Sequence, residues 1–122
     1  MPESGHTWRK PFKAEPIEAR HVRLWTAGRV THPDAPLIAS ELFVAVLASG
    51  AAAVEMTLST AGARIRITAQ GSDPLPVISS HGPGWALISG LAHTTGLTTD
   101  ERGLWAQLGA TRKLIETEVN QA

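Results

Sequence analysis

Residues 34–69, DAPLIASELFVAVLASGAAAVEMTLSTAGARIRITA, change their hydrophobic period partway along the stretch. Asp34 can cap a helix through its side chain, and the apolar run after it predicts a helix over residues 35–49. This helix is apolar nearly all round, so we expect it to be buried between other elements. Beyond residue 53, apolar and polar side chains alternate in two runs separated by Ala61-Gly62. This pattern predicts a β-hairpin with one solvent-exposed face.

The flanking residues complete the expected order of elements. Three- and four-residue apolar spacing indicates helices, and two-residue alternation indicates strands. The remaining predicted elements are an edge strand at residues 8–12, helices over 16–30 and 85–93, strands over 94–99 and 104–108, and a terminal helix over 111–121. This order predicts a two-layer α+β sandwich, in which helices cover one face of a largely antiparallel mixed sheet.

Composition sets limits on function. The 122 residues, 43% of them hydrophobic, fit a single domain over residues 1–122. Eleven basic residues balance eleven acidic ones, so no global field draws the chain to nucleic acid or to an anionic membrane. The absence of cysteine excludes disulfides and thiolate metal sites and is compatible with a reducing cytoplasm. No apolar run approaches the ~18 residues of a membrane span, so we expect a cytoplasmic protein without a secretion signal or anchor.

The motif DAPLIASEL at residues 34–42 resembles the lead into the N box of the GHKL ATPase domain, the Bergerat or histidine-kinase-like fold. This family includes the small anti-sigma-factor serine kinases and many short ATP-binding regulators of actinomycetes. In the family, a Glu acts as general base and an Asn four residues later binds the magnesium that bridges the phosphates. Glu41 matches the base, but the Asn position falls on Ala45, which offers no oxygen to a hard cation. The resemblance covers about residues 10–108 and leaves 109–122 outside it.

The strand and turn at residues 65–76 look like the G1 box of the same family. There an Asp at the end of the strand accepts a hydrogen bond from the adenine amino group. Aligning Asp73-Pro74 to the family's Asp-Pro places Gly71 in this role, where it has no side chain to offer. A shift of the alignment by two residues would give the role to Asp73 instead, although the strand phase opposes this shift.

Gly82-Pro83-Gly84 resembles the G2 box, whose backbone amides line the triphosphate at a helix N-terminus. Pro83 removes one of these amides because proline has no N–H. A lone Gly-x-Gly is weak support in any protein. The resemblance therefore implies a degenerate nucleotide site at Ala45, Gly71, Asp73, Gly82 and Gly84.

Glu41 is either a retained general base or a structural acid, and without the metal-binding Asn we favour the structural acid. The five histidines have no spacing that would bring three ligands together, so we expect no metal site. Arg64 and Arg66 share one strand face and can contact a phosphate or nucleic acid. Two charges on the wet side of a hairpin more often serve solubility, and we favour that interpretation.

Four tryptophans stand out in a chain with two phenylalanines and no tyrosine. Trp25 and Trp105 have the phase of core residues. Trp8 and Trp85 lie next to loops, where an indole ring can anchor a protein interface. For each of the four tryptophans we favour a role in core packing, and we keep partner binding as a hypothesis for Trp8 and Trp85.

These observations lead to three alternatives. The first is a non-catalytic GHKL-fold regulator, similar to an anti-sigma factor, that binds a sigma factor, its antagonist or a transcription regulator and has lost or impaired ATP binding. The second is a divergent serine kinase that uses ATP and magnesium through Glu41, Asp73, Gly82 and Gly84. The third is a dimeric scaffold for a DNA-binding transcription regulator. The resemblance also implies a homodimer that pairs through the strand at residues 8–12. From the balanced charge, we expect no direct contact with nucleic acid or membrane. Under the first alternative we expect no cofactor.

Overall fold

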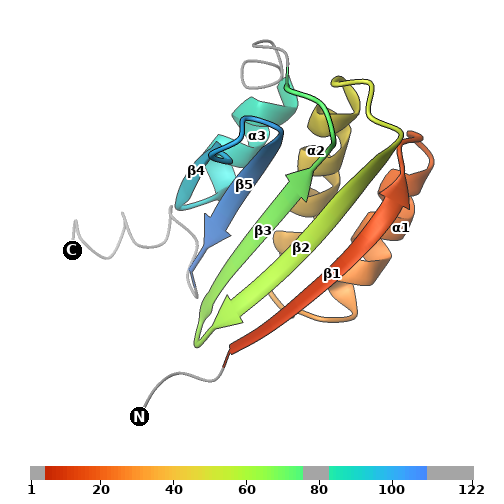
Figure 1. The fold of residues 1–122 in the computed structure, drawn as a ribbon. Coiled ribbons are helices and arrows are strands. Elements are labelled where there is room, and N and C mark those ends of the chain that lie inside the picture. Colours follow the sequence, from red (N-terminus) through yellow and green to blue (C-terminus); the bar gives the residue numbers. More distant parts are fainter. Residues whose placement is uncertain (1–4, 76–82, 110–122) are drawn as a thin grey trace.

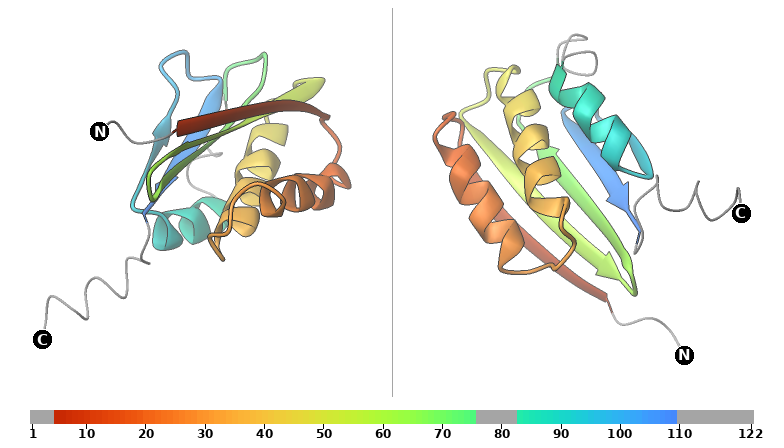
Figure 2. Two further views of the ribbon diagram at one scale, coloured as in Figure 1. Left: turned by 90° about the horizontal axis from the view of Figure 1, so that it is seen from below. Right: turned by 180° about the vertical axis from the view of Figure 1, so that it is seen from behind.

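The computed structural model describes residues 5–75 and 83–109, which form a five-stranded sheet with three helices against one face (Figures 1 and 2). The elements in chain order are β1 (Gly5–Lys13), α1 (Glu18–Ala27), α2 (Ala35–Leu47), β2 (Ala53–Ala61), β3 (Arg64–Gln70), α3 (Pro83–Leu91), β4 (Thr94–Leu97) and β5 (Gly103–Leu108). The strands lie in the order β1-β2-β3-β5-β4, so β1 and β4 form the two edges. None of the described helices has the length and hydropathy to cross a membrane.

The predicted two-layer α+β sandwich is confirmed, and so is the edge strand near the N-terminus. The expected mixed character of the sheet is wrong for the described strands, because all four of their pairings are antiparallel. The element ends differ by a few residues: α1 and α2 are shorter than predicted, and α3 begins two residues earlier, at Pro83. Proline suits a first helical turn, because the N–H groups of that turn have no acceptor within the helix and the missing N–H therefore costs no hydrogen bond. The predicted terminal helix at 111–121 lies outside the described residues.

The hydrophobic core lies between α2 and the central strands. Apolar residues alternate along β2 and β3 as the hairpin pattern predicts, and this face packs against α2. The fully buried side chains at this contact include Ile38, Leu42, Phe43 and Val46 of α2 and Val54, Met56, Leu58 and Ile67 of the hairpin. Trp25 of α1 is buried beside them, as predicted, with its ring edge-on to that of Phe12 at 5.8 Å between centroids.

Two expectations about α2 are wrong. The helix is not buried all round, because Leu37 is 39% exposed and Val44 is 45% exposed on the side away from the sheet. A two-layer fold has no third layer to cover that side. Asp34 stands at the N-cap position, but its side chain makes no capping hydrogen bond. Its backbone N–H donates instead to Nδ1 of His32, at 3.1 Å.

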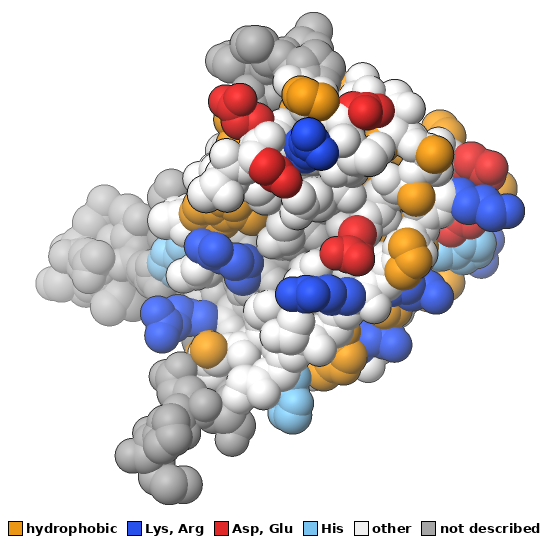
Figure 3. Space-filling model, viewed as in Figure 1, with side chains coloured by type: hydrophobic (Ala, Val, Ile, Leu, Met, Phe, Trp, Pro, Cys, Tyr) orange, Lys and Arg blue, Asp and Glu red, His pale blue; other side chains and the backbone are white. Residues whose placement is uncertain are grey.

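Trp105 lies on the open face of the sheet, so its predicted core position is wrong. Leu104, Ala106 and Leu108 of β5 are buried against the helices, and the two-residue alternation of the strand places Trp105 on the opposite side. The register across the sheet aligns Thr68 of β3 with Trp105 and with Gly96 of β4. Figure 3 views the molecule from this open side.

Two glycines provide a matched test of how tightly the sheet is packed. A Cβ built on the buried Gly103 would lie 2.6 Å from the carbonyl oxygen of Ala69, whereas one on the exposed helical Gly90 would meet nothing within 4 Å. Because a backbone atom cannot move aside cheaply, Gly103→Ala should lower the free energy of unfolding by about 1–3 kcal/mol. Gly90→Ala should raise it by about 0.5–1 kcal/mol, because alanine loses less entropy in a helix. Urea titration measures both, and equal effects would contradict the close strand contact.

Candidate functional site

The family's nucleotide positions gather along one side of α2. Glu41 and Ala45 are four residues apart and therefore lie on the same helical face, and Ser49 follows beyond the helix end. Glu41 faces the first turn of α3, while Val46 and Ser49 face the segment that follows β3. Ala45 stands between these two contacts, half-buried against the core. Glu41 and Gly84 thus lie in contact at one end of this face, and Gly71 lies against Val46 and Ser49 at the other. Glu41, Gly71 and Gly84 are positions predicted for a nucleotide site from the resemblance.

Glu41 lies against the beginning of α3. A Cβ built on Gly84 would lie 2.7 Å from Oε2 of Glu41, so the carboxylate touches the backbone of the first turn. A helix N-terminus carries a partial positive charge and favours an anion, whether a phosphate or a carboxylate. Here that position faces a carboxylate of the chain itself, which would repel a phosphate in the absence of a bridging cation. Gly82, the other predicted glycine of this motif, lies outside the described residues.

Gly71 packs closely against the end of α2. A Cβ on Gly71 would lie 3.0 Å from Cβ of Ala51, 3.3 Å from Oγ of Ser49 and 3.3 Å from Cγ1 of Val46. A side chain at this position, including the aspartate that the family places there, would crowd these neighbours. Gly71 offers adenine no side-chain acceptor, and its own N–H donates to the carbonyl of Arg102 at 3.0 Å. Asp73, the alternative acceptor, is exposed.

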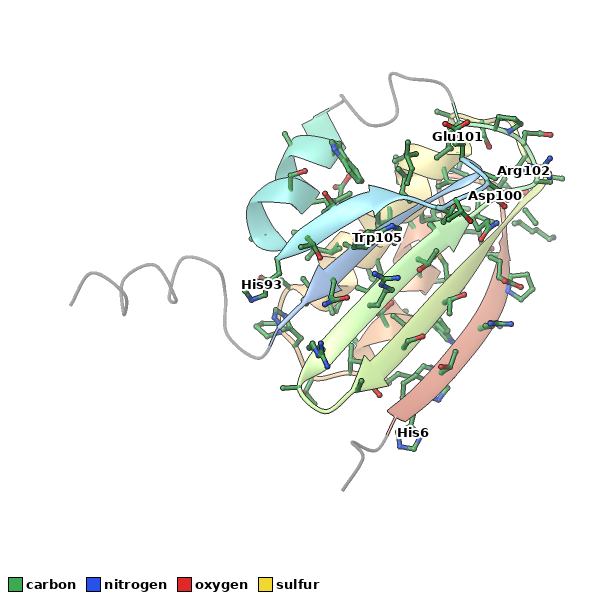
Figure 4. The ribbon with its side chains drawn as sticks, turned by 60° about the vertical axis from the view of Figure 1, so that its left-hand side comes forward. His6, His93, Asp100, Glu101, Arg102 and Trp105 are labelled. Carbon is green, nitrogen blue, oxygen red and sulfur yellow. The ribbon has the colours of Figure 1, made fainter. Side chains whose placement is uncertain are left out.

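The turn between β4 and β5 holds the segment after β3, a role that sequence reasoning missed. Oδ1 of Asp100 accepts hydrogen bonds from the Thr98 hydroxyl at 2.6 Å and from the Arg102 N–H at 3.0 Å. Its Oδ2 accepts one from the side-chain amide of Gln70 at 2.6 Å. The carbonyl of Glu101 then accepts the N–H of Leu75, so the turn is bonded to residues 71–75. Figure 4 shows Asp100, Glu101 and Arg102 together at this end of the sheet.

The hydrogen bond from the Thr98 hydroxyl, followed by that from the Arg102 N–H, holds the pKa of Asp100 below its ordinary value. The folded state therefore binds this proton less readily than the unfolded chain does. Stability from this carboxylate is present above its unfolded pKa of about 4 and is lost as the pH falls through the lower folded value.

Asp100→Asn should therefore flatten the decline of unfolding free energy below about pH 4 and lower the stability at neutral pH. The variant keeps an acceptor oxygen but removes the charge that strengthens both bonds at Oδ1. Urea titrations at several pH values measure the slope, with Asp73→Asn as an exposed carboxylate outside the turn. Identical slopes for the two variants would show that the Asp100 hydrogen bonds do not couple to folding.

Trp8 and Trp85, for which we favour core packing and keep partner binding as a hypothesis, are both half-buried and packed against the hydrophobic core. Trp8 stacks on the ring of His6, with 5.6 Å between centroids and 24° between planes. It also lines an open hollow of about 510 Å³ between the hairpin end of the sheet and the connection from α1 to α2, which includes Arg29 and His32. Trp8 therefore borders a surface depression large enough to receive a side chain of a partner.

Within residues 5–75 and 83–109, no three histidine or acidic side chains gather in a group that could hold a metal ion. No protein-family model matches the sequence, and no curated protein matches it either. Functional inference for this chain therefore rests on the fold and on the contacts described above.

Proposed function

We propose that the chain is a non-catalytic regulatory protein that binds a protein partner, on a scaffold similar to the GHKL ATPase domain. The proposal assigns it a role like that of an anti-sigma factor, with a sigma factor, its antagonist or a transcription regulator as partner. The step from fold to partner class is analogy, because one fold serves many functions. We also propose that the chain forms a homodimer that pairs through β1, which is an edge strand of the sheet.

The observation that carries the proposal is the loss of chemistry along α2. Magnesium requires oxygen ligands, and Ala45 provides none at the position where the family has its Asn. Gly71 packs against Val46 and Ser49 and leaves adenine without its acceptor. The Glu41 carboxylate lies where the phosphates would approach, so a nucleotide would meet an uncompensated negative charge. This arrangement supports a scaffold role over phosphoryl transfer.

A thermal melt with and without millimolar magnesium-ATP tests the loss of nucleotide binding. A ligand at about a hundred times its dissociation constant adds about 2.7 kcal/mol and moves the midpoint of a domain of this size by several degrees. We expect no shift. A shift that survives Glu41→Ala and disappears in Asp73→Ala would contradict the proposal and favour the divergent serine kinase.

Affinity capture with the immobilised chain, from lysate of the cells that express it, tests the partner. We expect retention of a protein by the wild-type chain and at least about tenfold weaker retention by Trp8→Ala, because central aromatic residues dominate interface energies. Leu24→Ala, a truncation of an exposed apolar residue of α1, is the control. Circular dichroism verifies that both variants fold. Equal retention by the two variants would exclude the Trp8 surface, and retention of nucleic acid alone would contradict a protein partner.

A further inference from the structure

A small hollow lies on the open face of the sheet, away from the α2 site. It measures about 140 Å³ and is lined by residues 59–61, 64–66 and 107, of which Ser59, Thr60, Arg64, Arg66 and Gln107 have polar side chains. A second hollow of about 320 Å³ shares Arg64 and Gln107 with it and extends to His93. The register explains this gathering, because Ser59, Arg66 and Gln107 stand opposite one another on three adjacent strands. All of these polar groups can donate hydrogen bonds.

Arg66 is held in place by Trp105. Its guanidinium lies 4.1 Å from the centroid of the indole ring, which is a close cation–π contact. Within residues 5–75 and 83–109, the structure records neither a carboxylate partner nor a hydrogen bond for this guanidinium. A stacked guanidinium keeps the N–H groups on its edge available for a planar, bidentate acceptor.

The indole ring is itself fixed by β4. Nε1–H of Trp105 donates to the carbonyl of Leu97 at 3.2 Å. A Cβ built on Gly96 would lie 2.8–3.0 Å from three atoms of the ring, so glycine is required for the ring to lie against this strand. Figure 4 shows Trp105 on the sheet between the turn at Asp100 and His93. The stack is therefore a built feature of the sheet, with a defined position before any ligand binds.

Charge is distributed unevenly over this face. The register places Arg64 and Arg66 near the hairpin turn of β2 and β3, whereas Arg9 stands opposite Thr57 in the middle of the sheet. Glu55 pairs with Gln70 at the other end, and Asp100 is bonded to that same Gln70. Figure 3 shows basic and acidic side chains intermixed in the middle and upper part of the face, and basic ones without acidic neighbours in its lower part. The hollow thus lies at the basic end of a chain whose net charge is zero.

We propose that this end of the open face binds an acidic protein segment, with Arg66 contacting a carboxylate in bidentate fashion. Ser59 and Gln107 supply neutral donors beside it, and Arg64 adds positive charge along the neighbouring hollow. This inference rests on the proposed binding of a protein partner and names the chemistry of one of its contact segments. The two adjoining hollows suit successive acidic side chains of an extended segment.

A nucleic acid fits this surface less well. Single strands bind through bases that stack on free aromatic faces and through several phosphate contacts. Arg66 already covers the indole ring, so a base would have to displace it in order to stack. Glu55 and Asp100 would repel a phosphate backbone that continued along the face. A short run of aspartate or glutamate side chains requires neither stacking nor a long basic track.

Fluorescence anisotropy with a fluorescein-labelled octaglutamate peptide at low salt tests this site on the full chain. We expect saturable binding that Arg66→Gln weakens by about tenfold or more, because it removes a charge-assisted bidentate contact. Arg66→Lys keeps the charge but loses the planar edge, and it should weaken binding several-fold. Arg20→Gln, which removes the same charge from the exposed surface of α1, is the control and should change binding by less than about twofold.

Equal losses of affinity in Arg66→Gln and Arg20→Gln would contradict the proposed site, because they would show that the peptide responds only to the net charge of the protein. Absence of peptide binding would overturn it as well. Tighter binding of a labelled thymidine dodecanucleotide than of the peptide would point to nucleic acid and would also overturn the proposal. These failures are separable from failure of the proposed function. A melt that shifts with magnesium-ATP removes the pseudo-ATPase proposal, whereas a flat melt without peptide binding removes only this surface.

Discussion

The contact between α2 and the hairpin of β2 and β3 is the constraint on which the other elements depend. Ile38, Leu42 and Val46 of the helix have no exposed surface, and the hairpin presents to them a face of alternating apolar residues. A strand that slipped by one residue would turn this entire face toward water, so the register of the sheet is fixed by the same contact. The first turn of α3 then lies against α2 at Glu41, and the segment after β3 lies against Val46 and Ser49.

This close packing accounts both for the structure of the candidate site and for its shortage of side-chain groups that could bind a nucleotide. The segment after β3 approaches α2 so closely at Gly71 that a Cβ would already crowd Val46 and Ser49. The residue that permits this approach is also the residue that lacks an acceptor for adenine. Likewise, Gly84 allows Glu41 to reach the first turn of α3, and the carboxylate then lies where an anionic ligand would otherwise bind. Both contacts belong to the packing of the scaffold around α2.

Local sequence periodicity was sufficient to predict the hairpin, the helices and the two-layer architecture. Prediction from periodicity failed where a side chain's position depends on contacts with residues distant in the chain. Trp105 alternates with the buried Leu104, Ala106 and Leu108 and so lies on the open face, where Gly96 of β4 accommodates its ring and Arg66 of β3 covers it; no local pattern indicates these two contacts. The bond from Gln70 to Asp100 joins residues thirty positions apart, so no local pattern indicates that the turn holds the G1-like segment. The contact of Glu41 with Gly84 likewise spans two elements.

The open face of the sheet obeys a different constraint, because a large aromatic side chain there must be shielded from water without a second layer. Arg66 covers the indole ring of Trp105, and the ring packs on Gly96 beneath it. Arginine suits this role because its guanidinium is weakly hydrated and stacks on aromatic rings. A side chain already ordered by such a stack loses little conformational entropy when it binds a partner, which favours affinity. The shielding of one tryptophan therefore orders the adjacent guanidinium before a partner binds, on the face of the sheet opposite to α2.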